Sequence, residues 1–72
     1  MHPHDAYKKT PAELVLCLKR AGWKQMAIAD RAETTQATIS RILSGRHKHP
    51  RYDVVERLRD AVVELDEFQP VA

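Results

Sequence analysis

Two consecutive short segments of this chain, residues 24–33 and residues 35–44, carry apolar residues at helical spacing, with only a brief break between them. In the first segment, Ile28, Ala29 and Ala32 form one apolar stripe. The small Ala29 allows a neighbouring helix to pack closely at that point. The pattern therefore predicts two short helices joined by a tight turn, around which the rest of the chain must fold.

The second segment is predicted to have an apolar side and a polar side. Thr35 is suited to cap the helix because its hydroxyl can accept a backbone N–H of the first turn, and Gly45 is suited to end it because the residue after a helix often needs a positive φ. At about 100° per residue, Ile39 and Ile42 fall about 300° and 240° from Gln36 and share the inward side. The residues expected to face outward together are Gln36, Ala37, Ser40 and Arg41.

The outward side chains have the chemical groups that read DNA bases. A glutamine can donate to and accept from an adenine edge, an arginine can donate twice to a guanine edge, and an alanine leaves room for a thymine methyl group. The alternative is an ordinary solvated helix face, and this would be the preferred interpretation if the helix stood alone in the sequence. The flanking segment favours DNA, because a helix, a brief break and a second helix have the spacing of a helix-turn-helix motif.

The sequence from about residue 12 to residue 62 resembles the lambdoid phage repressor and Cro family. The residues that carry the resemblance are Gln25, Ile28-Ala29, Thr34-Thr35-Gln36, Ile39, Ile42, Gly45 and the basic loop that ends in Pro50-Arg51. The resemblance implies an all-α fold, a small bundle of four to five helices of the lambda-repressor-like DNA-binding type. It also implies a dimer that binds a near-palindromic double-stranded DNA operator, with one recognition helix in each of two successive major grooves.

The residues expected to contact DNA form two groups. Those expected to read base edges are Gln36 and Arg41, assisted by Thr35, Ala37 and Ser40. In the resembled family, a glutamine at the start of the motif's first helix bonds a phosphate, and the helix N-terminus adds a partial positive charge. The residues expected to hold phosphates are Lys24, Gln25, Arg46, Lys48 and Arg51. The alternative for the second group is simple solvation.

Two single positions and one pair depart from the family pattern. Lys24 occupies the place of an N-cap residue, where lysine caps poorly although its charge suits a phosphate. Glu33 occupies the turn, where the family usually has glycine, and a left-handed backbone there would cost about 1 kcal/mol. The turn is therefore expected to be either altered or strained. Leu18 and Leu43 replace residues that pair opposite charges in some members, so we expect the two leucine side chains to touch.

The charged residues are unevenly distributed along the 72-residue chain, whose formal net charge is +2. Residues 1–59 contain all 12 lysines and arginines against six acids, whereas residues 60–72 contain four acids and no lysine or arginine. A basic body with an acidic end fits a polyanion-binding domain that has another role at its C-terminal end. A chain of this length forms one small core, and dimerisation is a common source of added stability for such cores.

The expected organisation is a flexible N-terminal arm at residues 1–10, a helix-turn-helix domain at residues 11–66 and a C-terminal tail at residues 67–72. The domain's first helix is expected to begin at Thr10-Pro11, where a capping residue precedes a proline. Its last helix, from about residue 51 to about residue 65, has more apolar surface than one small core usually absorbs. The surplus residues, expected to form a dimer interface, are Val55, Val62, Phe68 and Val71.

These features predict a sequence-specific DNA-binding transcriptional regulator, a Cro-like or immunity-type phage or prophage repressor that acts in the bacterial cytoplasm at the nucleoid. The alternative is an antitoxin or other protein-interaction module that neutralises a partner through the acidic C-terminal part. No enzyme, cofactor or small-molecule substrate is expected, because the lone Cys17 and the carboxylates form no catalytic arrangement. No membrane span is expected either, because no apolar run approaches about 20 residues. No metal site is expected at the two His-x-His pairs, because no nearby cysteine or acid completes a tetrahedral set of ligands with them.

Overall fold

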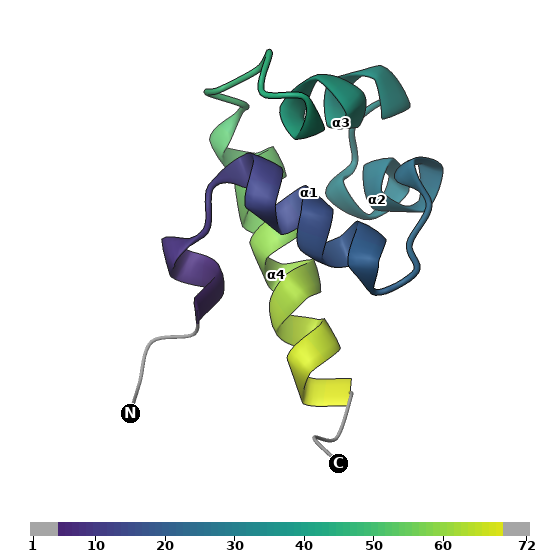
Figure 1. Ribbon diagram of the computed structural model, residues 1–72, viewed down its shortest axis with the longest axis vertical. Coiled ribbons are helices and arrows are strands. Elements are labelled where there is room, and N and C mark those ends of the chain that lie inside the picture. The colour runs from purple at the N-terminus through teal and green to yellow at the C-terminus, as the bar shows by residue number, and fades with distance from the viewer. Residues whose placement is uncertain (1–4, 69–72) are drawn as a thin grey trace.

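A computed structural model describes residues 5–68, and every regular element within that range is a helix (Figure 1). A short 3-10 helix, η1 (Asp5–Lys8), comes first. The α-helices that follow are α1 (Pro11–Arg20), α2 (Gln25–Ala32), α3 (Gln36–Leu43) and α4 (Tyr52–Phe68). The predicted all-α bundle of four to five helices is therefore confirmed. Among these elements, none combines the length and the apolar character that crossing a membrane requires.

Local sequence sets both ends of α1. At its start, the backbone N–H of Thr10 donates to Glu13 Oε1 at 2.9 Å, and the backbone N–H of Glu13 donates to Thr10 Oγ1 at 3.2 Å. This reciprocal pair is a capping box, which satisfies two backbone donors at once. At the other end, Gly22 takes a φ of 101°, and the N–H of Trp23 returns to the carbonyl of Leu18 at 3.1 Å. The predicted start of the first helix at Thr10-Pro11 is confirmed.

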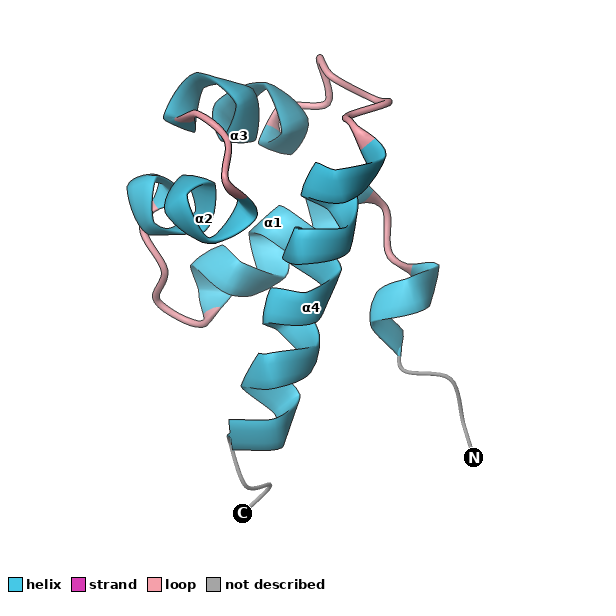
Figure 2. Ribbon diagram, turned by 180° about the vertical axis from the view of Figure 1, so that it is seen from behind, coloured by secondary structure: helices cyan, strands magenta, loops and turns pink. Residues whose placement is uncertain are grey.

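The longest helix, α4, is the support for the others. It packs against α1, α2 and η1, while α1 and α2 each pack against α3. The pair α2 and α3 lies at one end of the molecule, and the C-terminal part of α4 extends away from that end beyond the other helices (Figures 1 and 2). The shared core contains Ala6, Leu14, Val15, Leu18, Ile28, Ala29, Ala32, Ile39, Ile42, Val54, Leu58, Ala61 and Val62.

The structure alters two of the expected boundaries. The arm predicted at residues 1–10 is not flexible throughout, because η1 packs against α4 and the side chain of Ala6 is completely buried. The C-terminal boundary expected at residue 66 falls inside α4, which continues to Phe68. Residues 1–4 and 69–72 lie outside the described residues, and the expected tail from residue 69 onward lies there too.

The leucine pair expected between the first and third helices lies in the shared core. Leu18 on α1 is completely buried, and Leu43 on α3 is half-buried against the same cluster. Trp23, in the connection from α1 to α2, is also half-buried against that cluster. Apolar side chains therefore hold α1 against α3 at the place where some members of the resembled family pair opposite charges.

Candidate nucleic-acid interface

The orientation of α3 is fixed by its N-cap and by two isoleucines. Thr35 Oγ1 accepts the backbone N–H of Thr38 at 3.1 Å, as predicted for the cap. Ile39 and Ile42 are 0% and 1% exposed. Because these two side chains are buried, the opposite side of α3 faces solvent. The residues expected to read bases are all exposed: Thr35, Gln36, Ala37, Ser40 and Arg41.

Thr38 is a half-buried residue at the edge of this face, and it was not among the residues expected to contact DNA. Its hydroxyl lies 2.9 Å from the hydroxyl of Thr35. Thr35 Oγ1 already accepts the backbone N–H of Thr38, so donation by the Thr38 hydroxyl would leave the Thr35 proton free for an acceptor on DNA. The signal in the sequence was the Thr-x-x-Thr spacing, because residues three apart are neighbours on a helix surface.

The turn between α2 and α3 keeps a left-handed backbone, although its residue is not glycine. Glu33 has φ 56° and ψ 46°, and it is the only non-glycine residue with positive φ within residues 5–68. The N–H of Glu33 returns to the carbonyl of Asp30 at 3.2 Å. The N–H of Thr34 returns to that of Ala29 at 2.9 Å. Of the two expected outcomes for this turn, the structure therefore shows the strained one.

The start of α2 has no side-chain cap. Lys24, at the N-cap position, has an extended backbone and makes no capping hydrogen bond, as expected for lysine. Its side chain is exposed, and Gln25 beside it is half-buried. The first N–H groups of a helix have no partner within the helix, and the helix dipole favours an anion near them. Lys24 adds a full positive charge at this end, so the arrangement suits a phosphate.

Hydrogen bonds tie the basic loop between α3 and α4 to the end of α3. The carbonyl of Arg41 accepts the backbone N–H of Arg46 at 3.0 Å and that of His47 at 3.1 Å. The hydroxyl of Ser44 donates to the same oxygen at 3.1 Å. Gly45 permits this reversal with a φ of 83°. The backbone of Arg41, whose side chain is expected to read a base, therefore fixes the position of the loop. The cations expected to hold phosphates here are all exposed: Arg46, Lys48 and Arg51.

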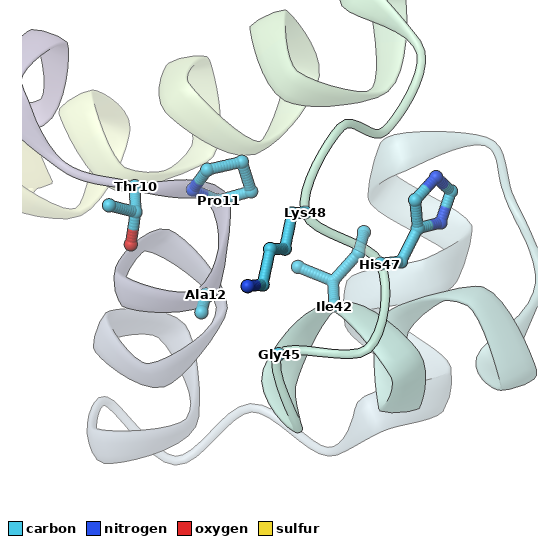
Figure 3. A pocket seen from close by; sticks show the side chains of 7 residues that line it. All are labelled: Thr10, Pro11, Ala12, Ile42, Gly45, His47 and Lys48. Carbon is cyan, nitrogen blue, oxygen red and sulfur yellow. The ribbon is translucent and has the colours of Figure 1, made fainter.

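A cavity of about 300 Å³ separates this loop from the start of α1 (Figure 3). Thr10, Pro11 and Ala12 line one side of it, and Ile42, Gly45, His47 and Lys48 line the other. The Lys48 side chain lies across the cavity toward α1 (Figure 3). The lining is mainly apolar and contains a single histidine, His47, which is too few ligands for a metal ion. No cluster of three or more metal-binding side chains occurs within the part of the chain that the structure describes.

A carboxylate at the start of α4 lies beside one of the loop cations. Arg51 Nε is 3.4 Å from Asp53 Oδ1, and 83% of the Arg51 side chain remains exposed. Burial raises the pKa of Asp53, but the Arg51 cation, the backbone N–H of Val54 and the Arg57 cation together outweigh it. The pKa of Asp53 therefore lies below its ordinary value of 3.8. The carboxylate is therefore ionised at neutral pH and forms an ion pair with Arg51 at the end of the loop.

The structure changes the expected dimer surface. Val62 is only 2% exposed and belongs to the core of the single chain, so it offers no surface to a partner. The reason is that the second apolar stripe of α4 is partly used inside the monomer, where α4 packs against several elements. Val55 is half-buried against the same core. The side chain of Phe68 and all of Val71 lie outside the described part of the structure.

The site consists of a capped helix with an exposed polar side, a preceding helix joined to it by a tight turn, and a basic loop at its end. These three features define a helix-turn-helix domain, which is a DNA-binding module. The chain belongs to the helix-turn-helix domain family, whose model matches residues 13–66. It is similar to a protein designated P2 of Acyrthosiphon pisum secondary endosymbiont phage 1, with 39% identity over 59 residues. That alignment covers 82% of this chain and 63% of the phage protein, so this chain spans less than two thirds of its relative. No solved structure gave a significant match. The predicted membership of the phage helix-turn-helix family is confirmed.

Proposed function

We propose that this chain is a sequence-specific transcriptional regulator, a Cro-like or immunity-type repressor of a phage or prophage, and that it binds a near-palindromic operator. The observation that carries the proposal is the two-sided construction of α3. Ile39 and Ile42 hold one side in the core, and Gln36 and Arg41 are exposed on the other. In a major groove these two side chains have the donors and acceptors that distinguish adenine and guanine from the other bases.

The surrounding cations support the same geometry of binding. Phosphate contacts fix the position and register of a protein on DNA, and base contacts supply the sequence preference. The start of α2, with Lys24 and Gln25, and the loop after α3, with Arg46 and Lys48, lie at the two ends of the helix-turn-helix unit. Contacts at both ends would hold the exposed side of α3 against the base edges.

A dimer completes the proposal. Two copies related by a two-fold axis would place their α3 helices about 34 Å apart, in successive major grooves of one DNA face. The C-terminal part of α4 extends beyond the other helices (Figure 1), which leaves it accessible to a second copy. Val55, Val63 and Leu65 are apolar α4 residues that remain partly exposed. Repression would follow from exclusion of RNA polymerase at the occupied operator.

Selection of bound sequences from a random double-stranded DNA pool tests the proposed function directly. We expect enrichment of a near-palindrome whose half-sites are separated by about one helical turn, 10–10.5 base pairs. Arg41→Ala protein, selected in parallel, should lose preference at one or two positions in each half-site. If the wild-type protein enriches no sequence and is instead recovered with a protein partner, the regulator function is wrong and the antitoxin alternative is favoured.

A further inference from the structure

The left-handed turn of the helix-turn-helix unit carries a long acidic side chain that reaches α4. Glu33 Oε2 lies 3.1 Å from the Nε of Arg57. The Arg57 side chain is 33% exposed, and that of Glu33 is 69% exposed. A glycine at this position would fit the backbone without strain, but it would have no side chain to reach α4. The strained residue therefore provides a link that the unstrained one cannot.

Arg57 is itself held in place on its own helix. Its Nη1 lies 3.3 Å from Oδ2 of Asp53, one turn earlier on α4. Asp53 also accepts the backbone N–H of Val54 at 3.0 Å. The carboxylate of Asp53 therefore orients the Arg57 guanidinium independently of its contact with Glu33. A side chain held in this way loses less entropy when it forms the second ion pair.

A second ion pair joins the last turn of α2 to the C-terminal part of α4. Arg31 of α2 pairs with Glu64 of α4, and both side chains are partly buried. The two ion pairs have opposite arrangements of charge. The cation lies on α4 in the pair Arg57–Glu33 and on α2 in the pair Arg31–Glu64. The two pairs therefore fix the C-terminal end of α2 on α4 at two separate points. The turn that follows α2 determines where α3 begins.

We infer that Glu33 and Arg57 are positioning residues for DNA recognition: their ion pair uses α4 to fix the angle of the turn from which α3 projects. This inference rests on the proposed function. Neither residue is assigned a DNA contact. A glutamate in the turn has a more strained backbone than glycine would have, but its side chain can form an ion pair with α4, against which the other helices pack.

A double-mutant cycle without DNA tests the link itself. Glu33→Gln keeps the size of the side chain and the left-handed backbone but removes the charge, and Arg57→Gln removes the other charge. Urea unfolding of the wild type, both single variants and the double variant should show coupling of about two- to fivefold in the folding equilibrium constant. Strictly additive effects would show that the ion pair does not join the turn to α4, and would overturn the inference.

Operator binding tests the positioning role, with Asp30→Asn as the matched control. Asp30 is an exposed acid of α2, and its replacement changes the net charge by the same amount as Glu33→Gln. We expect Glu33→Gln to bind the operator about two- to fivefold more weakly than Asp30→Asn, with equal binding to unrelated DNA. Equal operator affinity of these two variants would contradict the inference.

Two further readouts separate positioning from a general loss of stability or a direct contact. Glu33→Gly should unfold at the same or a higher urea concentration than wild type, because it relieves the left-handed strain, yet bind the operator more weakly. Undiminished operator affinity in Glu33→Gly would overturn the inference. Arg57→Gln should leave the salt dependence of binding unchanged, whereas a slope lower by about 1 would show that Arg57 itself holds a phosphate. If wild-type protein binds no DNA sequence, the proposed function fails, and the unfolding cycle still decides whether the link exists.

Discussion

Thr10 and Glu13 exchange hydrogen bonds across the first turn of α1, each accepting the backbone N–H of the other. The backbone N–H of Thr10 is the largest cause of a lowered pKa at Glu13, followed by the Thr10 hydroxyl. The pKa of Glu13 therefore lies below its ordinary value of 4.5. The start of α1 lies beside the basic loop (Figure 3), so this capping box bears on the part of the domain proposed to hold phosphates.

The lowered pKa of Glu13 predicts a specific acid sensitivity. A carboxyl group whose pKa is lower when folded contributes stability at pH values above its unfolded pKa, and this contribution disappears as pH falls through the folded pKa. Stability from the capping box should therefore be present above the ordinary pKa of 4.5 and be lost as pH falls through the lower pKa of the folded state. NMR titration of the Glu13 carboxyl in wild-type and Thr10→Ala protein measures the effect. Thr10→Ala keeps the backbone N–H and removes the hydroxyl, so the Glu13 pKa should rise only part of the way toward 4.5. An identical titration in both proteins would show that the Thr10 hydroxyl does not lower this pKa.

Replacing Arg41 should damage recognition rather than folding. We expect Arg41→Ala to lose about 1–3 kcal/mol of operator binding and to relax sequence preference at one or two base pairs. The side chain is exposed, so the urea midpoint should stay close to that of wild type. Arg20→Ala at the exposed end of α1 removes the same charge and is the control. The base-reading role is wrong if both variants lose affinity equally for every sequence.

Replacing Lys48 should weaken binding to all DNA sequences alike. A phosphate contact carries no sequence information, so Lys48→Ala should leave the selected operator unchanged. The slope of log affinity against log salt concentration should fall by about 1, because one fewer phosphate is neutralised. Titrations at several salt concentrations give this slope, with Lys19→Ala on α1 measured alongside. An unchanged slope would place Lys48 away from the DNA.

Removing the side-chain cap of α3 should lower the stability of the domain. Thr35→Ala deletes the acceptor for the Thr38 backbone N–H and should cost about 0.5–2 kcal/mol of stability by urea unfolding. Thr35→Ser retains the hydroxyl and should recover most of that loss. If the serine variant is as stable as wild type but binds the operator more weakly, the lost methyl group contacts DNA. Equal stability of the alanine variant would mean that the cap contributes little to this helix.

The two faces of α3 could be predicted because they depend only on helical periodicity and on residue type. Ile39 and Ile42 fall on one side of any helix drawn through this segment, and the Thr35 cap depends on a neighbour three residues away. The same local reasoning anticipated the capping position at Thr10. These predictions required no knowledge of what the helix packs against.

The predictions that needed revision depended on tertiary packing. Ala6 gives no periodic signal by itself, and its burial in η1 arises only because α4 passes beside it. Val62 lies on a stripe that could have faced a partner, but the arrangement of the other helices around α4 places it in the core. The contact between Glu33 and Arg57 joins the turn after α2 to α4, 24 positions later in the chain, so no local pattern in the sequence indicates it.

The Arg41 carbonyl accepts three hydrogen bonds from the basic loop. Phosphate binding by the loop and base recognition by the Arg41 side chain are therefore coupled in this domain. A change that distorts residues 44–47 would move the backbone from which the Arg41 side chain extends. Such a change would alter which bases are preferred as well as how tightly DNA is held. Evolution toward a new operator would therefore be expected to vary the side chains of Gln36 and Ala37 while preserving the backbone path of this loop.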